Sequence, residues 1–184
     1  MQYQGTALLK NGKTVLLRNA TEDDAEAVYN IFQQTHAETD FLLSYPEENS
    51  FDVTGEAEFL KNVFQQDNEA EILAYVDGRL AGTAGIHAVG SKFKVRHRAE
   101  FGISVLREFW GCGIGRALTE ACIECAKRSG YLQLELDAVA ENETALGLYR
   151  SVGFTEYGRN PLGFKSRFSG MQELVLMRLE LNSK

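Results

Sequence analysis

The sequence contains few cysteines, no basic run and no long apolar run, and each shortage excludes a class of protein. Three cysteines, an odd number, provide no disulfide framework, which favours a reducing cytoplasm. No apolar run approaches membrane-spanning length, and residues 1–5 (MQYQG) lack the basic and apolar regions of a secretion signal, so no membrane partner is expected. Because the net charge is −7 and lysine and arginine are scattered, no nucleic-acid partner is expected either.

What remains is the composition of one ordinary globular domain. The chain has 184 residues, of which 44% are hydrophobic and 24% are charged. A chain of this length buries roughly 70% of its unfolded surface on folding. It contains no repeat and no low-complexity tract, so we expect a single domain over residues 1–184. The acidic balance is compatible with a cationic substrate such as an amine.

The central feature is the glycine-rich sequence W-G-C-G-I-G-R at residues 110–116. Residues 99–105 before it are partly β-branched and bounded by charges, which predicts a strand. After it, apolar residues recur at helical spacing from Ile114 to Cys125, which predicts a helix. Glycine permits unusual φ values, and the first N–H groups of a helix lack internal partners. Strand, turn and helix together therefore predict a cradle for a phosphate group.

Other readings of this turn fit less well. A dinucleotide-binding fold requires G-x-G-x-x-G, but the last position here is Arg116, and no acidic residue clearly closes a following strand at the distance of the ribose. A P-loop requires Gly-Lys-Ser/Thr, which is absent. The remaining alternative is a plain connecting turn, although three alternating glycines are more than an ordinary helix entry needs.

A second motif, N-x-x-A-x-x-L-Y-x-x-x-G-F, runs from Asn142 to Phe154. Together the two motifs resemble those of the GCN5-related N-acetyltransferases (the GNAT superfamily), and residues 164–177 are similar to its ribosomal-protein-acetyltransferase branch. The resemblance covers roughly residues 14–177. It implies an N-acetyltransferase that uses acetyl-CoA as co-substrate, without a metal. The expected acceptor is a primary amine on a small molecule or a peptide N-terminus, attacked directly in a ternary complex, and the family often forms homodimers.

The predicted fold class is α/β (α+β), a mixed, mostly antiparallel sheet of about seven strands flanked by helices. An Asp-Gly pair at residues 77–78 between apolar runs predicts a hairpin. One parallel pair is expected within residues 99–138, joined by a helix over residues 115–129.

The helix starts and the C-terminal strands are predicted from local signals. Thr21 and Thr54 are expected to cap the two earlier helices. The last two strands are expected over residues 154–158 and 173–181, with a loop around residues 159–170 between them.

The resemblance also implies the coenzyme contacts. The backbone of the glycine turn would hold the diphosphate, and the strand before it would pair with the pantetheine arm, with an N–H near Val105 polarising the thioester carbonyl. Trp110 stands where the family usually has Gln or Arg, which removes a side-chain donor but leaves the amides. The expected cofactor-binding residues are Ile103, Ser104, Val105, Gly111, Cys112, Gly113, Ile114, Gly115, Arg116, Asn142 and Tyr149.

The expected catalytic residues are a tyrosine and a carboxylate. Tyr149 matches the family's general acid, which gives its proton to the departing CoA thiolate; its alternative role is a core tyrosine. The attacking amine must first lose a proton, so a base is expected nearby. Glu100, expected to be partly buried by its apolar neighbours, is the first candidate, Asp137 the second and Glu135 the third. The alternative for each is a solvated strand residue.

Several other features keep two interpretations. Residues 39–49 are rich in aromatic side chains and either line the acceptor pocket, as in the family, or simply pack. Cys122 and Cys125 fall on the apolar helix stripe and are interpreted as core residues rather than half a zinc site. Cys112 lies at a helix start, where a redox role stays open. The rival functions are a non-catalytic acyl-CoA-binding or sensor module and a nucleotide-binding oxidoreductase domain.

Overall fold

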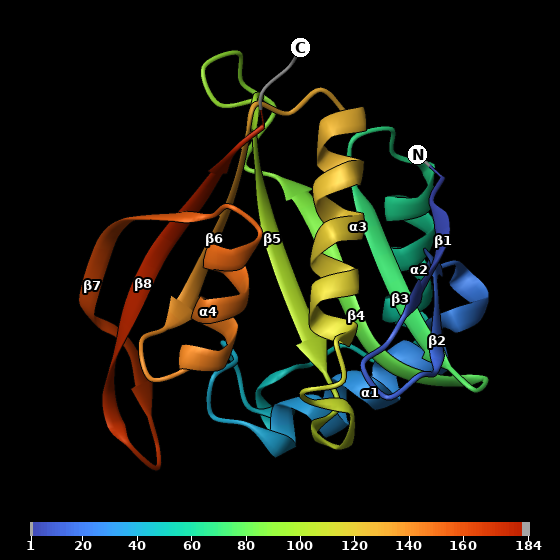
Figure 1. Cartoon of the computed structure of the whole chain (residues 1–184), viewed down its shortest axis with the longest axis horizontal. Coiled ribbons are helices and arrows are strands. Elements are labelled where there is room, and N and C mark those ends of the chain that lie inside the picture. Colours follow the sequence, from blue (N-terminus) through green and yellow to red (C-terminus); the bar gives the residue numbers. More distant parts are fainter. Residues whose placement is uncertain (1, 182–184) are drawn as a thin grey trace.

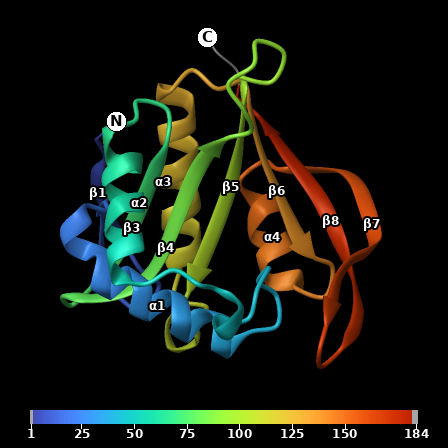
Figure 2. The same cartoon turned by 180° about the vertical axis from the view of Figure 1, so that it is seen from behind.

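The computed structural model describes residues 2–181, in which a sheet of eight strands carries helices on both faces (Figures 1 and 2). Helices α3 (Ile114–Arg128) and α4 (Glu143–Ser151) cover one face, and α1 (Ala25–Glu38) and α2 (Val53–Gln65) cover the other. The predicted fold class is confirmed, but the sheet has eight strands rather than seven. Over this described range, no helix combines the length and the apolar character needed to cross a membrane.

The strands lie in the order β1-β2-β3-β4-β5-β6-β8-β7. Neighbours pair antiparallel except β5 and β6, which are parallel and joined by α3, as predicted. The strand bounds are β1 Gln4–Leu8, β2 Thr14–Asn19, β3 Ala70–Val76, β4 Arg79–Ala88, β5 Arg98–Val105, β6 Gln133–Val139, β7 Thr155–Ser166 and β8 Gly170–Glu180. The extra strand is β1, a short edge strand without a fully buried residue, which explains why its sequence carries no clear apolar alternation.

One of the two predicted helix caps was wrong. Thr21 is the N-cap of a short 3-10 turn over Glu22–Asp24, which continues directly into α1 at Ala25. Helix α2 is capped by Asp52 rather than by Thr54, because the Asp52 carboxylate accepts a hydrogen bond from the Gly55 N–H at 2.9 Å. Both helices still begin at the predicted places to within a few residues, since cap residues of similar chemistry stand close together.

The predicted loop over residues 159–170 was also wrong, because β7 continues to Ser166 and turns directly into β8. The pairing of β7 with β8 is irregular between Asn160 and Phe164, and Pro161 lies within this irregularity. A proline lacks the N–H needed for a regular ladder, so the sequence resembles a loop although the chain remains extended. The predicted hairpin at Asp77 is confirmed, with left-handed φ values of 51° and 79° at residues 77 and 78.

The split between β5 and β6 positions the functional site. The two strands pair only over residues 98–100 and 133–135, whereas β4 and β5 pair over residues 82–88 and 99–105. Beyond Glu100 the two parallel strands diverge, as Figure 1 shows. The outer part of β5 therefore has one edge without a neighbouring strand.

The main apolar core lies between the sheet and helices α3 and α4. Cys122 and Cys125 are fully buried in it, which confirms their interpretation as core residues, and burial raises the pKa of Cys125 to about 11. A smaller core cluster lies on the other face, under α1 and α2. Nearby, burial and then the adjacent carboxylate of Glu56 raise the pKa of Glu71 to about 8.

Candidate active site

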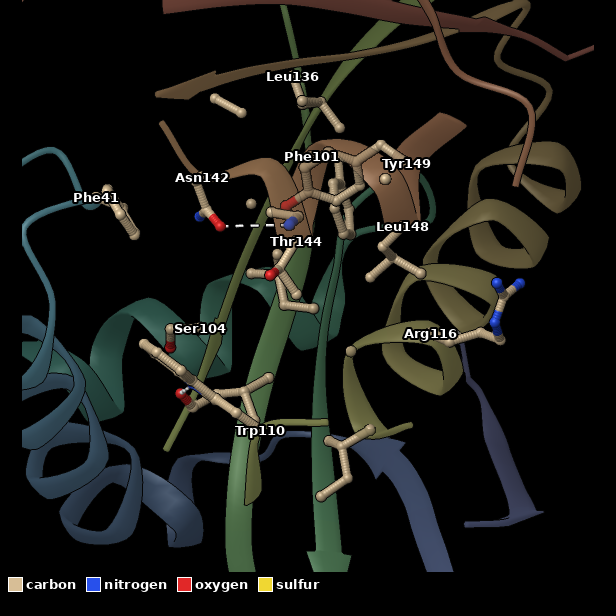
Figure 3. Close-up of a pocket in the computed structure, with 18 of the residues that line it drawn as sticks. Phe41, Phe101, Ser104, Trp110, Arg116, Leu136, Asn142, Thr144, Leu148 and Tyr149 are labelled. Carbon is tan, nitrogen blue, oxygen red and sulfur yellow. Dashed lines mark hydrogen bonds between the residues drawn. The ribbon is translucent and has the colours of Figure 1, made fainter. Parts of the chain in front are cut away.

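A cleft of about 1350 Å³ opens where β5 and β6 separate (Figure 3). It is lined by the start of α3, the free part of β5, the outer part of β6 and the start of α4. We call one end, formed by residues 111 and 113–116, the amide end. We call the other end, where Glu100, Glu135 and Asp137 lie, the acidic end.

The amide end owes its shape to two glycines with left-handed backbone. Gly111 has a φ of 75°, and Gly113, the N-cap residue of α3, has a φ of 105°. A Cβ atom at either position would meet no neighbouring atom closer than 3.9 Å. The backbone conformation, rather than a lack of space, therefore requires glycine here. Between them, the Cys112 carbonyl accepts a hydrogen bond from the Lys10 N–H at 3.0 Å, which fixes the turn to the β1–β2 hairpin.

The N–H groups of residues 111 and 113–116 have no hydrogen-bond acceptor anywhere in residues 2–181. The first helical bond is donated by the Ala117 N–H to the carbonyl of the N-cap residue, at 3.1 Å. Unpaired N–H groups at a helix start bind anions, and the helix dipole adds to this attraction. Cys112 differs from the other five predicted cradle residues, because its N–H donates to the Phe109 carbonyl (3.5 Å) and the residue does not line the cleft.

The free edge of β5 presents main-chain groups to the same cleft. The Leu106 N–H donates to the Ala81 carbonyl, and the Arg98 carbonyl accepts from Val89, so even-numbered residues of β5 bond to β4. By this alternation, the main-chain groups of Ile103 and Val105 face the gap towards β6, whereas those of Ser104 face β4.

Trp110 contributes a contact that the sequence did not predict. Its indole N–H donates a hydrogen bond to the Val105 carbonyl at 2.7 Å, and its ring lines the cleft. Trp110, which stands in place of the Gln or Arg usual in the family, therefore still carries a side-chain donor, but this donor bonds to β5. No local pattern indicates this bond, because it depends on how the turn folds back over the strand.

Tyr149 lies deep in the cleft, beside Phe101 and close to Asn142 in Figure 3. Its side chain is 7% exposed and packs edge-on against Phe101, with 6.1 Å between ring centroids. Burial raises the pKa of the phenol to about 12, so it is protonated at neutral pH. Its hydroxyl has no hydrogen-bond partner in the described chain. Asn142 caps α4 by accepting a hydrogen bond from the Ala145 N–H at 3.3 Å.

The three carboxylates of the acidic end lie in different environments. Glu135 is buried and forms a two-pronged ion pair with Arg98, which holds the pKa of Glu135 below its usual value. Asp137 makes no hydrogen bond or ion pair with the described residues. Its pKa is raised, first by desolvation and then by the nearby charges of Glu100 and Glu135. Glu100 also has no partner in this range. Both Glu100 and Asp137 are exposed, so the partial burial expected for Glu100 was wrong.

The outer wall of the acidic end is made of aromatic and apolar residues. Residues 41–43, from the segment after α1, line the cleft, as do Tyr157, Phe164 and Leu176 from β7 and β8. The first group agrees with the interpretation that residues 39–49 form part of the pocket. The second group was not predicted to line the pocket; Phe164 was placed in a loop because β7 was predicted to end at residue 158.

One carboxylate joins the two parts of this wall. Asp40 accepts hydrogen bonds from the hydroxyls of Ser166 (2.6 Å), Ser169 (3.0 Å) and Tyr45 (3.1 Å), and from the Gln172 amide at 3.3 Å. The segment after α1 is thereby fastened to the β7–β8 turn. We refer to these contacts as the Asp40 junction.

Comparison with known proteins assigns this arrangement to a family. Residues 25–154 match the family model described as Acetyltransferase (GNAT) family. The chain belongs to the GNAT family. This confirms the resemblance predicted from the two motifs, both of which lie within the matched residues.

Solved and curated relatives agree with this assignment. A GNAT-family acetyltransferase from Streptococcus pneumoniae superposes with a TM-score of 0.86 at 27% identity, over 91% of this chain and 99% of that chain. A ribosomal-protein-alanine N-acetyltransferase from Brucella melitensis gives a TM-score of 0.80 at 27% identity, over 90% and 99%. Human N-acetyltransferase 8B is 27% identical over 124 residues, which are 65% of this chain and 55% of that protein. The chain spans about half the length of the curated relatives it matches.

Acetyl-CoA is the co-substrate of the GNAT family, and the residues of the cleft fit it. The unpaired N–H groups of residues 111 and 113–116 suit a diphosphate, and the free edge of β5 suits the amide-containing pantetheine arm. Within the part of the chain that the structure describes, no group of three or more His, Cys, Asp or Glu side chains is arranged to hold a metal ion.

Proposed function

We propose that this GNAT protein transfers the acetyl group of acetyl-CoA to a primary amine, on a small molecule or at a peptide N-terminus. One observation carries the proposal: a single cleft joins five unpaired helix-start N–H groups to a buried tyrosine and a carboxylate group. An anion-binding end and a cation-attracting end are what an anionic acyl donor and an amine acceptor need.

Binding of the donor begins at the amide end. The N–H groups of residues 111 and 113–116 donate to the diphosphate, while Cys112 supports the turn through its carbonyl. Along β5, the main-chain groups of Ile103 and the N–H of Val105 would hold the pantetheine arm, since the Val105 carbonyl already accepts from the Trp110 indole, and the Val105 N–H would polarise the thioester carbonyl. When bound, acetyl-CoA supplies a thioester that an amine can attack.

The acidic end prepares the acceptor. Asp137 is suited to take a proton from the ammonium, because its raised pKa brings it nearer to neutral pH. Glu135 is occupied by Arg98, which leaves Glu100 and Asp137 as the unpaired carboxylates of this end. Tyr149 is protonated and unpartnered, so its hydroxyl can donate to the departing sulfur.

Direct transfer from donor to acceptor is supported by the positions of the cysteines. Cys112 is not among the residues that line the cleft, and Cys122 and Cys125 are fully buried in the core. Burial also raises the pKa of both core thiols, which disfavours the nucleophilic thiolate. An acyl-cysteine intermediate therefore has no suitable side chain.

The test combines CoA binding with thiol release, comparing wild type with Tyr149→Phe across a panel of amines and peptides. We expect the variant to bind CoA as wild type does, but to release thiol roughly 10²- to 10⁴-fold more slowly. Its stability should be unchanged or slightly higher, because the lost hydroxyl has no partner. Tight CoA binding by the wild type without release in the presence of any amine would instead favour a non-catalytic acyl-CoA-binding or sensor module.

A further inference from the structure

The two cationic side chains that line the cleft are both found towards the amide end. They are Arg116, which is part of that end, and Lys10, whose N–H bonds to the glycine turn at Cys112. Arg116 is held there by Glu120 at 3.3 Å and by the Ser151 hydroxyl at 2.7 Å. No cation among the described lining residues is found at the acidic end. An anionic group on the acceptor would therefore find no lining partner near the reacting amine.

The acidic end itself carries uncompensated negative charge. Arg98 neutralises Glu135, but Glu100 and Asp137 form neither an ion pair nor a hydrogen bond within residues 2–181. The pKa of Asp137 is raised first by desolvation and then by the charge of Glu100, so the two carboxylates are close enough to interact. In a partly enclosed site such charges stabilise a bound ammonium and repel a bound carboxylate.

A second observation indicates that a ligand reaches this place. Tyr149 is more than nine-tenths buried and lines the cleft, yet its hydroxyl has no partner in the described chain. The hydroxyl is not among the fully enclosed polar atoms of the described chain, so it is accessible from the cleft and free to bond a group that enters there. The surrounding wall offers mainly apolar surface, from Phe41, Tyr157 and Phe164.

We infer that the acceptor is a primary amine attached to an apolar, uncharged group, with no carboxylate near the amino group. This inference rests on the proposed acetyl transfer and narrows its acceptor class. Arylalkylamines, amino-acid amides and the N-termini of peptides with an apolar first residue belong to this class. Free amino acids are excluded by the repulsion between their carboxylate and the pair Glu100 and Asp137.

The experiment measures kcat/KM by CoA release for phenylalaninamide, 2-phenylethylamine and phenylalanine, at saturating acetyl-CoA. The wild type should prefer the amide to the free amino acid by at least tenfold. The amino groups of phenylalaninamide and phenylalanine differ in intrinsic reactivity, so the wild-type preference alone does not decide the question. The decisive quantity is how the ratio of the two kcat/KM values changes in the double variant Glu100→Gln/Asp137→Asn. We expect the ratio to fall by at least tenfold, even if both rates decrease.

A matched control removes two remote charges. Glu26 and Glu58 are exposed carboxylates on α1 and α2 outside the cleft, and the double variant Glu26→Gln/Glu58→Gln should leave the ratio unchanged. If the Glu100/Asp137 variant is too slow to assay, binding of the amide and the acid to the CoA-loaded protein by calorimetry gives the same comparison.

Two outcomes would overturn different statements. Equal use of phenylalanine and phenylalaninamide, or an unchanged ratio in the Glu100/Asp137 variant, refutes the acceptor class and leaves acetyl transfer standing. Tight CoA binding without transfer to any of the three amines or to a peptide refutes the proposed function, and the acceptor class with it.

Discussion

The glycine at the start of α3 allows the proposed diphosphate site to be tested separately from stability. In Gly113→Ala, the new Cβ meets only Leu9 and Lys10 at ordinary contact distance, so no steric clash is created. The cost arises from the φ of 105°, which an L-residue adopts at a penalty of about 1–2 kcal/mol. For a chain of this length, such a loss lowers Tm by a few degrees without preventing folding.

The effect on binding should be larger than the strain suggests. To relieve the strained φ, the backbone rotates at residue 113 and turns the neighbouring N–H groups away from a common point. Each hydrogen bond to a charged group is worth about 1.5–3 kcal/mol. Misaligning one or two of them therefore weakens CoA binding by roughly 10- to 100-fold, since 1.4 kcal/mol corresponds to tenfold.

The same helix provides a matched control. Gly130, just beyond the end of α3, has a φ of 80°, is exposed and has open space around its Cβ position. Gly130→Ala should lose a similar amount of stability in thermal denaturation but keep the wild-type Kd for CoA in calorimetry. If Gly113→Ala also keeps that Kd while folded, the amide end does not bind the diphosphate, and the assignment of the cleft fails.

Two further predictions concern the Asp40 junction and the buried carboxyl of Glu71. Asp40→Ala removes hydrogen bonds that hold the pocket wall together, so the KM for the amine should rise by about tenfold, which corresponds to about 1.4 kcal/mol of binding free energy. The Kd for CoA should stay unchanged. An equal loss of CoA affinity would contradict the separation of the amide end from the acidic end. In the folded protein the pKa of Glu71 is about 8, above its ordinary value of 4.5. The neutral carboxyl therefore leaves the free energy of unfolding unaffected below pH 4.5. As the pH rises from 4.5 towards 8, the free energy of unfolding falls by up to about 1.4 kcal/mol per pH unit. In urea titrations between pH 5 and 8, Glu71→Gln should flatten this decline, and an identical slope in both proteins would refute the burial argument.

The amide end was predictable because its determinants are local. Positive φ at Gly111 and Gly113, the unpaired N–H groups and the position of Tyr149 on α4 all follow from residues within about forty positions of one another. Sequence patterns of glycine spacing and helical periodicity record such short-range constraints directly.

The rest of the site depends on contacts that a linear pattern does not record. The hydrogen bond from the Trp110 indole to the Val105 carbonyl depends on how the turn folds back, and the bond between Ser166 and Asp40 joins residues 126 positions apart. The exposure of Glu100 is set by the divergence of β6 rather than by its neighbours in sequence. Because Pro161 interrupts the strand pattern, the extension of β7 was not predicted, and with it the lining side chain of Phe164 was missed.

The Asp40 junction has a consequence for engineering new acceptors. The coenzyme-facing residues come from one stretch of the chain, whereas the opposite wall is assembled from an early segment and a late hairpin. These two meet at Asp40 and at the ion pairs of Arg167 with Glu47 and Glu48. A chimera that takes the segment after α1 from a relative but keeps the native β7–β8 hairpin would combine two wall segments whose contacting residues are not complementary. Swaps intended to change substrate preference should therefore transplant both pieces jointly.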